Sequence, residues 1–157
     1  MRIGIGYDIH RLKKGLKLRL GGVLIPHTHG LVGHSDGDAL IHAVVDAVLG
    51  AAGLGDIGGY FSDKDRRFKN ADSRSFLRAV RRMLKEKKWT LVNVDSVLVA
   101  EKPDLSKFKS SMSQNIAREL GILASQVNVK AKTNEGLGSV GKGKALACYA
   151  VVSLKGK

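Results

Sequence analysis

The sequence predicts an α/β (α+β) fold, in which a mainly antiparallel or mixed sheet carries its helices on one face. Two observations predict this fold. Several short stretches alternate apolar residues with other residues, which is typical of strands, and three longer stretches repeat apolar residues every three or four positions, which is typical of helices. The elements follow the order β-β-α-α-β-α-β-β, which favours one sheet backed by helices.

Residues 2–25 are expected to form one or two β-hairpins. Every second residue from Ile3 to Ile9 is apolar, whereas the residues between them are glycine, aspartate or histidine. A second alternating stretch at 16–20 is followed by two glycines, which are suited to a turn.

Residues 36–53 are expected to form a deeply buried helix, because their apolar positions cover a broad face. Ser35 is the expected N-cap, with Asp38 in a capping-box-like position three residues later. Gly53 ends the helix. Residues 54–72 carry several glycines and aspartates but few periodic apolar residues, so we expect a long loop, and such loops are often functional.

The second half of the chain continues with helices and strands. Ser73 is expected to cap a helix that runs to about residue 88, and the outer face of this helix is rich in arginine and lysine. A basic face of this kind is either solvated or a surface for membrane or nucleic acid. The further expected elements are a strand at 91–100, a helix at 106–120, a strand at 127–132, a glycine-spaced loop at 133–143 and a strand at 145–154.

Size and charge narrow the class of protein. With 157 residues the chain has the length of one domain, so we expect residues 1–157 to form a single domain. Its 43% hydrophobic and 26% charged residues exclude wholesale disorder. A net charge of +13 favours anionic partners such as nucleic acid, a membrane surface or phosphorylated small molecules, or else reflects a generally basic surface.

The cysteine content and the hydropathy favour a cytoplasmic protein. Cys148 is the only cysteine, so an intramolecular disulfide is excluded. Residues 1–8 lack the apolar stretch of a secretory signal. The longest mostly apolar run, 39–54, contains His42 and Asp46 and is too short and too polar to span a bilayer comfortably.

A candidate zinc site combines a strand with a helix. Asp8 and His10 project to the same side of their strand, because side chains two positions apart share a face. His42, on the predicted buried helix, is either a satisfied core histidine or the third ligand. One oxygen and two nitrogens suit Zn²⁺ with an open fourth position, which is a catalytic arrangement. Asp46, one turn from His42, is either an acceptor for an imidazole N–H or solvated.

Three further polar clusters are candidates for binding. His27 and His29 form a competing histidine pair or lie in a surface loop. Residues 34–38 stand at the expected start of a helix, where free N–H groups are either capped or bind phosphate. In residues 132–135, Thr133 is suited to contact phosphate, and Glu135 to hold a hard divalent cation.

Taken together, these segments resemble the 2-C-methyl-D-erythritol 2,4-cyclodiphosphate synthases of the non-mevalonate isoprenoid pathway. The motifs span the chain in order, and only their combination is specific. They are G-x-G-Y-D-I-H at 4–10, G-G-V-x-I-P at 21–26, H-S-D-G-D-A-L-I-H at 34–42, L-G-D-I-G at 54–58, F-S-D at 61–63, A-D-S-R at 71–74, N-V-D at 93–95 and N-V-K-A-K-T-N-E-G-L-G at 128–138.

The resemblance implies a homotrimer of single catalytic domains, each with a mixed four-stranded sheet backed by helices and with active sites between subunits. It implies a phosphorus–oxygen lyase. The 2-phosphate of 4-diphosphocytidyl-2-C-methyl-D-erythritol 2-phosphate attacks the β-phosphorus, CMP leaves, and a cyclic diphosphate forms without water.

The resemblance also assigns roles to residues. Asp8, His10 and His42 would bind Zn²⁺, and Glu135 would share Mg²⁺ or Mn²⁺ with the substrate phosphates. His34 and Thr133 would stabilise the transition state, with Ser35 beside His34. The implied substrate contacts are Asp8, Ile9, His10, His34, Ser35, Asp56, Ile57, Gly58, Phe61, Ser62, Asp63, Lys64, Asp65, Ala100, Lys102, Pro103, Leu105, Ala131, Lys132, Thr133, Asn134, Glu135, Ser139 and Lys142.

The chain departs from the family pattern at four positions. Asp104 stands where lysine is common, which weakens an implied cytidine or phosphate contact. Ser139 replaces a frequent phenylalanine and Lys142 a frequent arginine at a cavity on the trimer axis proposed to hold an isoprenoid diphosphate. Lys132 stands where threonine is frequent.

Two other functions compete with the synthase. A zinc-dependent phosphohydrolase would use the same three ligands with metal-bound water as the nucleophile. A basic RNA-binding module would use residues 74–88, but only 5% of the chain is aromatic, which leaves few side chains for base stacking. The preferred interpretation therefore has a small-molecule cytidine diphosphate substrate and neither nucleic acid nor membrane as a partner.

Overall fold

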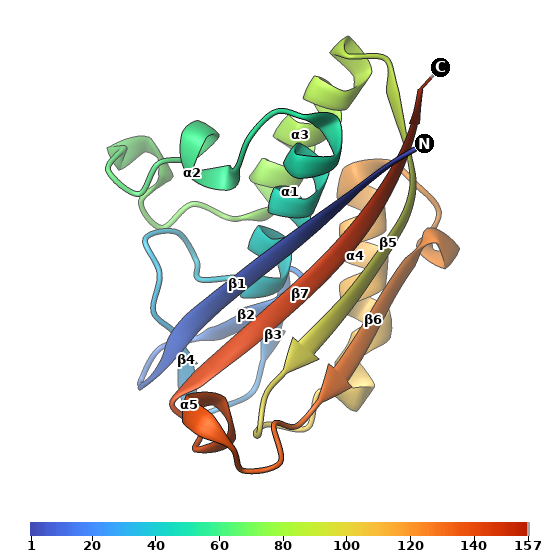
Figure 1. Cartoon of the computed structure of the whole chain (residues 1–157). Coiled ribbons are helices and arrows are strands. Elements are labelled where there is room, and N and C mark those ends of the chain that lie inside the picture. The colour runs from blue at the N-terminus through green and yellow to red at the C-terminus, as the bar shows by residue number, and fades with distance from the viewer. Residues whose placement is uncertain (157) are drawn as a thin grey trace.

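The computed structural model describes residues 1–156 and contains a twisted sheet with helices on one side (Figure 1). The expected single domain of residues 1–157 also includes Lys157, which lies outside this range. The strands are β1 (Arg2–Lys14), β2 (Leu18–Leu20), β3 (Val23–Ile25), β4 (His29–Leu31), β5 (Trp89–Val99), β6 (Val127–Lys132) and β7 (Ala145–Gly156). The α-helices are α1 (Ala39–Ala52), α2 (Ile57–Tyr60), α3 (Arg74–Glu86), α4 (Lys109–Leu120) and α5 (Gly138–Gly141).

The main sheet has five strands in the order β4-β1-β7-β5-β6, and β2 and β3 form a separate two-stranded sheet. The β5–β6 pair is parallel and the other neighbours are antiparallel, so the predicted mixed sheet is confirmed. The expected number of four strands is wrong. Strand β1 runs beyond its pairing with β7, which ends at Arg11, and its last three residues pair with β4.

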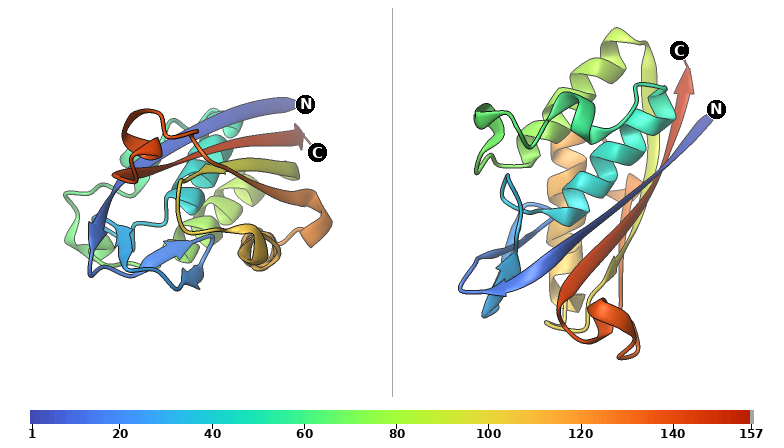
Figure 2. Two further views of the ribbon diagram at one scale, coloured as in Figure 1. Left: turned by 90° about the horizontal axis from the view of Figure 1, so that it is seen from below. Right: turned by 60° about the vertical axis from the view of Figure 1, so that its left-hand side comes forward.

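Helices cover one face of this sheet, as predicted, and leave the other face bare (Figure 2). Helix α1 packs against β1 and β7, and its apolar side chains are buried. The contact with β1 is close because β1 presents glycines to the helix. A Cβ atom at Gly6 would lie 1.9 Å from the carbonyl oxygen of Ala43, and one at Gly4 would lie 2.1 Å from that of Ala47.

The apolar side of β1 is therefore the exposed one. Ile3 and Ile5 keep 70% and 69% of their surface, and Tyr7 and Ile9 are also exposed. Tyr149 of β7 pairs with Tyr7 across the sheet, with ring centroids 4.8 Å apart. We call this set, with Val151 of β7, the outer apolar face.

Helix α1 begins at Ala39, later than expected, and its N-cap is Asp38 and not Ser35. The buried Asp38 carboxylate accepts hydrogen bonds from the backbone N–H of Ile41 in the helix and from those of Gly21 and Gly22. The same side chain thus caps α1 and holds the turn between β2 and β3. The two carboxylate oxygens of Asp38 share these three hydrogen bonds, whereas a serine hydroxyl has one oxygen.

The expected loop at 54–72 contains helix α2 and a 3-10 turn at Arg66–Phe68. Two more 3-10 turns lie at Ser106–Phe108 and Ala124–Gln126. Among residues 1–156, no helix has the length and apolar character needed to cross a membrane.

Candidate active site

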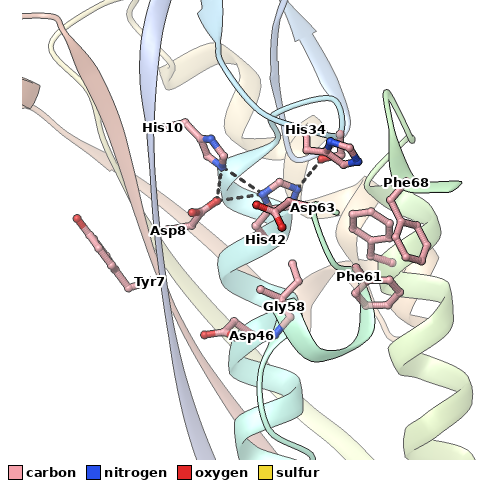
Figure 3. A pocket seen from close by; sticks show the side chains of 13 residues that line it. Tyr7, Asp8, His10, His34, His42, Asp46, Gly58, Phe61, Asp63 and Phe68 are labelled. Atoms are coloured by element: carbon pink, nitrogen blue, oxygen red, sulfur yellow. Dashed lines mark hydrogen bonds and ion pairs between the residues drawn. The ribbon is translucent and has the colours of Figure 1, made fainter. Parts of the chain in front are cut away.

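Asp8, His10 and His42 converge beside the inner face of β1 (Figure 3). The Oδ2 atom of Asp8 lies 2.8 Å from Nε2 of His10 and 3.0 Å from Nδ1 of His42. The two imidazole nitrogens lie 3.3 Å apart. Strand alternation brings Asp8 and His10 together, and the close approach of α1 to the glycines of β1 brings His42 to them.

The three ligand atoms fit a tetrahedral metal ion. A Zn²⁺ ion with bonds of about 2.0–2.1 Å holds neighbouring ligand atoms about 3.3 Å apart. The two imidazole nitrogens have this separation, and the two distances from Asp8 Oδ2, 2.8 and 3.0 Å, are somewhat shorter. Three protein ligands leave the fourth position for a substrate oxygen. In the described part of the chain this is the one group of three such side chains close enough to hold a metal ion, and His27 and His29 have no third ligand beside them.

The protonation of these groups favours a cation. Burial raises the pKa of the Asp8 carboxyl, but hydrogen bonds with His10 and His42 outweigh burial and hold this pKa well below its usual range. Burial lowers the pKa of His10, but the hydrogen bond and charge of Asp8 outweigh it, so the His10 pKa is raised. The site therefore keeps an ionised carboxylate at neutral pH.

A cavity of about 480 Å³ opens beside this cluster. It brings together many of the predicted substrate residues, namely Asp8, His10, His34, Ser35, Ile57, Gly58, Phe61 and Asp63. Phe61, Phe68 and Phe76 form an aromatic wall, with the rings of Phe61 and Phe76 stacked at 4.4 Å. The cavity thus combines ionisable groups with an apolar wall, as small-molecule sites do.

The remaining predicted residues of the 54–65 loop surround this cavity without lining it. Asp56 caps α2 through the N–H of Gly59, and Ser62 accepts the N–H of Lys64. The Nε2 atom of His34 lies 3.1 Å from the carbonyl oxygen of Asp65. The Ile9 side chain points to the outer apolar face, so only its backbone faces the group of Asp8, His10 and His42, which we call the metal cluster.

A second group of predicted residues lies across the sheet. A cavity of about 460 Å³ is lined by Ala100, Lys102, Pro103, Asp104, Leu105, Ala131, Lys132 and Thr133, with Glu101. Thr133 donates to Glu135, and the N–H of Asn134 donates to Glu101. Because β7 and β5 separate β1 from β6, Thr133 at the end of β6 lies about 14 Å or more from Asp8 and His10 on β1 in one chain.

The last two predicted residues lie near helix α5. Lys142 lines a third cavity, of about 360 Å³, together with His27, His29 and Lys102. Ser139 is exposed in α5, and its carbonyl accepts the N–H of Lys144.

Comparison with known proteins decides the family. The model of the YgbB family matches residues 1–155. The chain belongs to the YgbB family. A 2-C-methyl-D-erythritol 2,4-cyclodiphosphate synthase from Desulfosudis oleivorans is 56% identical over 151 residues, which cover 96% of this chain and 90% of that protein. The family resemblance predicted from the motifs is therefore confirmed.

Solved structures agree with this YgbB assignment. The bifunctional IspDF from Campylobacter jejuni is 42% identical with a TM-score of 0.95, and the match covers 99% of this chain and 42% of that one. A CDP complex of IspF from Plasmodium falciparum is 40% identical with a TM-score of 0.87, and the match covers 99% of this chain and 96% of that one.

Sequence reasoning missed the contacts of two polar side chains at this YgbB site. Asp46 was expected to accept an imidazole N–H or to be solvated, but its Oδ1 atom accepts the N–H of Ile57 and holds α2 against α1. Ser73 is the N-cap residue of α3, as predicted, but its side chain makes no capping hydrogen bond and lies 2.9 Å from Nε2 of His42 instead. The A-D-S-R motif at 71–74 includes Ser73, but a sequence motif does not show that this side chain contacts His42.

Proposed function

We propose that the chain converts 4-diphosphocytidyl-2-C-methyl-D-erythritol 2-phosphate into 2-C-methyl-D-erythritol 2,4-cyclodiphosphate and CMP. The observation that carries this proposal is the Asp8–His10–His42 cluster beside a cavity, in a chain that is 56% identical to a synthase of this name. The 2-phosphate oxygen forms a bond to the β-phosphorus while the bond from this phosphorus to CMP breaks. No water is consumed, so the enzyme is a phosphorus–oxygen lyase.

Asp8, His10 and His42 would hold Zn²⁺, which supplies positive charge to a phosphate oxygen when bound. His34 and Ser35, at the mouth of the same cavity, are placed to donate to phosphate. Asp63 is placed to accept from a hydroxyl of the methylerythritol unit, and the aromatic wall excludes water from it. Phosphoryl transfer needs mainly such positioning and neutralisation of charge.

Thr133 and Glu135 would act at the cytidine diphosphate end of the substrate. The cavity that Thr133 lines offers the backbone of β6 and the Lys102 and Lys132 side chains, which suit a nucleotide diphosphate. Glu135 would share Mg²⁺ or Mn²⁺ with the phosphates, because carboxylate and phosphate oxygens are the ligands that these ions prefer.

The distance between the two cavities supports a homotrimer with active sites between subunits. In one chain, Thr133 lies at the far side of the sheet from the metal cluster, so a substrate that touches both needs a second copy. The outer apolar face supplies a surface for that copy, because a contiguous exposed patch of this kind marks an interaction site. We further propose that each subunit is a single catalytic domain and that the enzyme is cytoplasmic.

The decisive experiment incubates the purified protein with the diphosphocytidyl substrate, Zn²⁺ and Mg²⁺. Release of CMP together with ³¹P signals of a cyclic diphosphate is the expected result. A phosphohydrolase would instead give an acyclic phosphorylated product with incorporation of solvent oxygen. Absence of any turnover, combined with tight binding of RNA, would favour the basic RNA-binding module.

A mixing experiment tests the shared site. Asp8→Ala and Thr133→Ala each remove one half of the proposed site and should be inactive alone. Unfolded, mixed and refolded together, they should regain part of the activity, because some interfaces then carry both wild-type halves. An active monomer in sedimentation would contradict the trimer.

A further inference from the structure

His42 contacts two serine hydroxyls on the side of its ring that faces away from Asp8. Its Nε2 atom lies 2.9 Å from Oγ of Ser73 and 3.1 Å from Oγ of Ser35. Ser73 is fully buried, at the N-terminus of α3. Behind it, its Oγ donates to Oδ1 of Asp36 at 2.5 Å, and its N–H donates to Oδ2 of the same carboxylate at 3.1 Å.

The carboxylate sets the direction of these hydrogen bonds. An ionised Asp36 only accepts, so the Ser73 hydroxyl proton points to Asp36. The Ser73 oxygen then offers only lone pairs to His42, so this contact favours a proton on Nε2 of His42. A metal ligand needs a free lone pair, and Nδ1 is the atom that faces Asp8 and His10. A proton held on Nε2 by Ser73 leaves Nδ1 free to exchange its hydrogen bond to Asp8 for a metal ion.

His10 is oriented in the opposite way by a different partner. Its Nδ1 atom lies 2.6 Å from the carbonyl oxygen of Val32, so Nδ1 donates there and Nε2 is the atom that faces the cluster. The two histidines therefore present different nitrogens to one point. A backbone carbonyl holds the first tautomer, and side chains alone hold the second.

We propose that Ser73 and Asp36 are positioning residues that fix the Nε2–H tautomer of His42 and so strengthen metal binding at Asp8, His10 and His42. This inference rests on the proposed zinc site. Ser35 contributes less, because its hydroxyl has no carboxylate behind it and lies 3.4 Å from Ser73 Oγ. Partners of this kind commonly change metal affinity by about 10–100-fold.

The first test reads the tautomer without metal. In metal-free protein labelled with ¹⁵N-histidine, long-range ¹H–¹⁵N correlation should show His42 protonated at Nε2. Ser73→Ala should shift the His42 proton from Nε2 toward Nδ1, which the Asp8 carboxylate accepts from. Asp36→Asn should do the same, because it replaces one acceptor oxygen by a donor. Wild-type His42 without a proton at Nε2 would overturn the proposal, as would unchanged protonation of His42 in Ser73→Ala.

The second test measures zinc affinity by competition with a chelator. Ser73→Ala and Asp36→Asn should each weaken zinc binding by about 10–100-fold, and Ser73→Thr, which keeps the hydroxyl, should recover part of the loss. Ser75→Ala is the matched control: its hydroxyl, in the same turn of α3, donates to the carbonyl of Asp72 and does not touch His42.

The outcomes separate this inference from the zinc proposal on which it rests. Wild-type protein that binds no zinc at this cluster would remove the proposed metal site, whatever the tautomer. Wild-type protein that binds zinc tightly, together with a Ser73→Ala variant of equal affinity, would overturn the role of Ser73 and leave the zinc site standing.

Discussion

The two faces of strand β1 carry different kinds of residue and meet different surroundings. The inner face has Gly4, Gly6, Asp8 and His10, and it lies against α1 and the metal cluster. The outer face has Ile3, Ile5, Tyr7 and Ile9, and within one chain it contacts solvent. The difference shows that the buried face of a strand is not always the apolar one. The inner face of β1 needs residues without a side chain at Gly4 and Gly6, because the backbone of α1 occupies the space that a side chain would fill.

The largest effect is expected from the inner face at Asp8. Asp8→Ala removes the only charged ligand of the cluster, so stoichiometric zinc should be lost and turnover should fall by about 10³-fold or more. Elemental analysis and the CMP assay measure both. Tyr7→Phe, one residue along and pointing to the opposite side of β1 (Figure 3), should keep its zinc. A triple variant of Asp8, His10 and His42 that kept stoichiometric zinc would contradict the assignment and point to His27 and His29.

His34 separates metal binding from catalysis at the cavity that the inner face opens into. His34→Ala should lower turnover by about 10²–10³-fold, the usual loss when one donor to a transition state is removed. Its zinc content should be unchanged. His34→Gln, which still donates one hydrogen bond, should recover part of the loss. Zinc loss equal to that of His42→Ala would make His34 a ligand instead.

Gly6→Ala tests the close packing of the inner face. The added Cβ would meet the backbone of Ala43 at 1.9 Å, which no side-chain rotation relieves, so we expect a loss of about 3 kcal/mol or more in the free energy of unfolding. Urea unfolding at one protein concentration measures it. Gly50→Ala is the matched control on α1: no atom lies within 4 Å of its Cβ, so this variant should be as stable as wild type or slightly more stable. Equal stability of the two variants would show that β1 and α1 can move apart at no cost.

Lysine substitutions test whether the outer apolar face is an interface between subunits. Ile3→Lys combined with Ile5→Lys should shift the protein from trimer to monomer in sedimentation, while circular dichroism keeps its wild-type form, because both side chains are exposed in the single chain. Leu123→Lys, at a position also 69% exposed but away from β1, should leave the trimer intact. Loss of secondary structure in the double variant would show that this face stabilises the subunit itself.

The smallest effect is the pH dependence of the metal-free protein. The Asp8 pKa is lowered on folding, so its stabilisation is present above about pH 4 and is lost as pH falls toward the folded pKa. The His10 pKa is raised, so its stabilisation is complete below about pH 6.5 and is lost as pH rises through the folded pKa. In chelator, Asp8→Asn should therefore cost more stability at pH 5.5 than at pH 8. An equal loss in the free energy of unfolding at pH 5.5 and at pH 8 would contradict the stabilising interaction between Asp8 and His10.

Much of the site was open to prediction because its signals are local. The two-residue spacing of Asp8 and His10 places both on one side of a strand, and the helical period places His42 on a buried face. Strand β4 was not predicted, because its three residues are too few to show the alternation of apolar and polar residues by which strands are recognised. Ser35 was expected to be a cap, but the N–H groups of Gly21 and Gly22, distant in sequence, select Asp38.

Local pattern was enough for the class of fold, the family and the choice of the three candidate ligands, because strand and helix periods and short motifs are properties of neighbouring residues. The other features of the site depend on how closely α1 packs against β1. It brings His42 to Asp8, sets Ser73 and Asp36 behind His42, and leaves the outer apolar face of β1 uncovered. These are contacts between residues more than 30 positions apart, whose distances depend on how the helix backbone packs on two glycines and on no local preference of the chain.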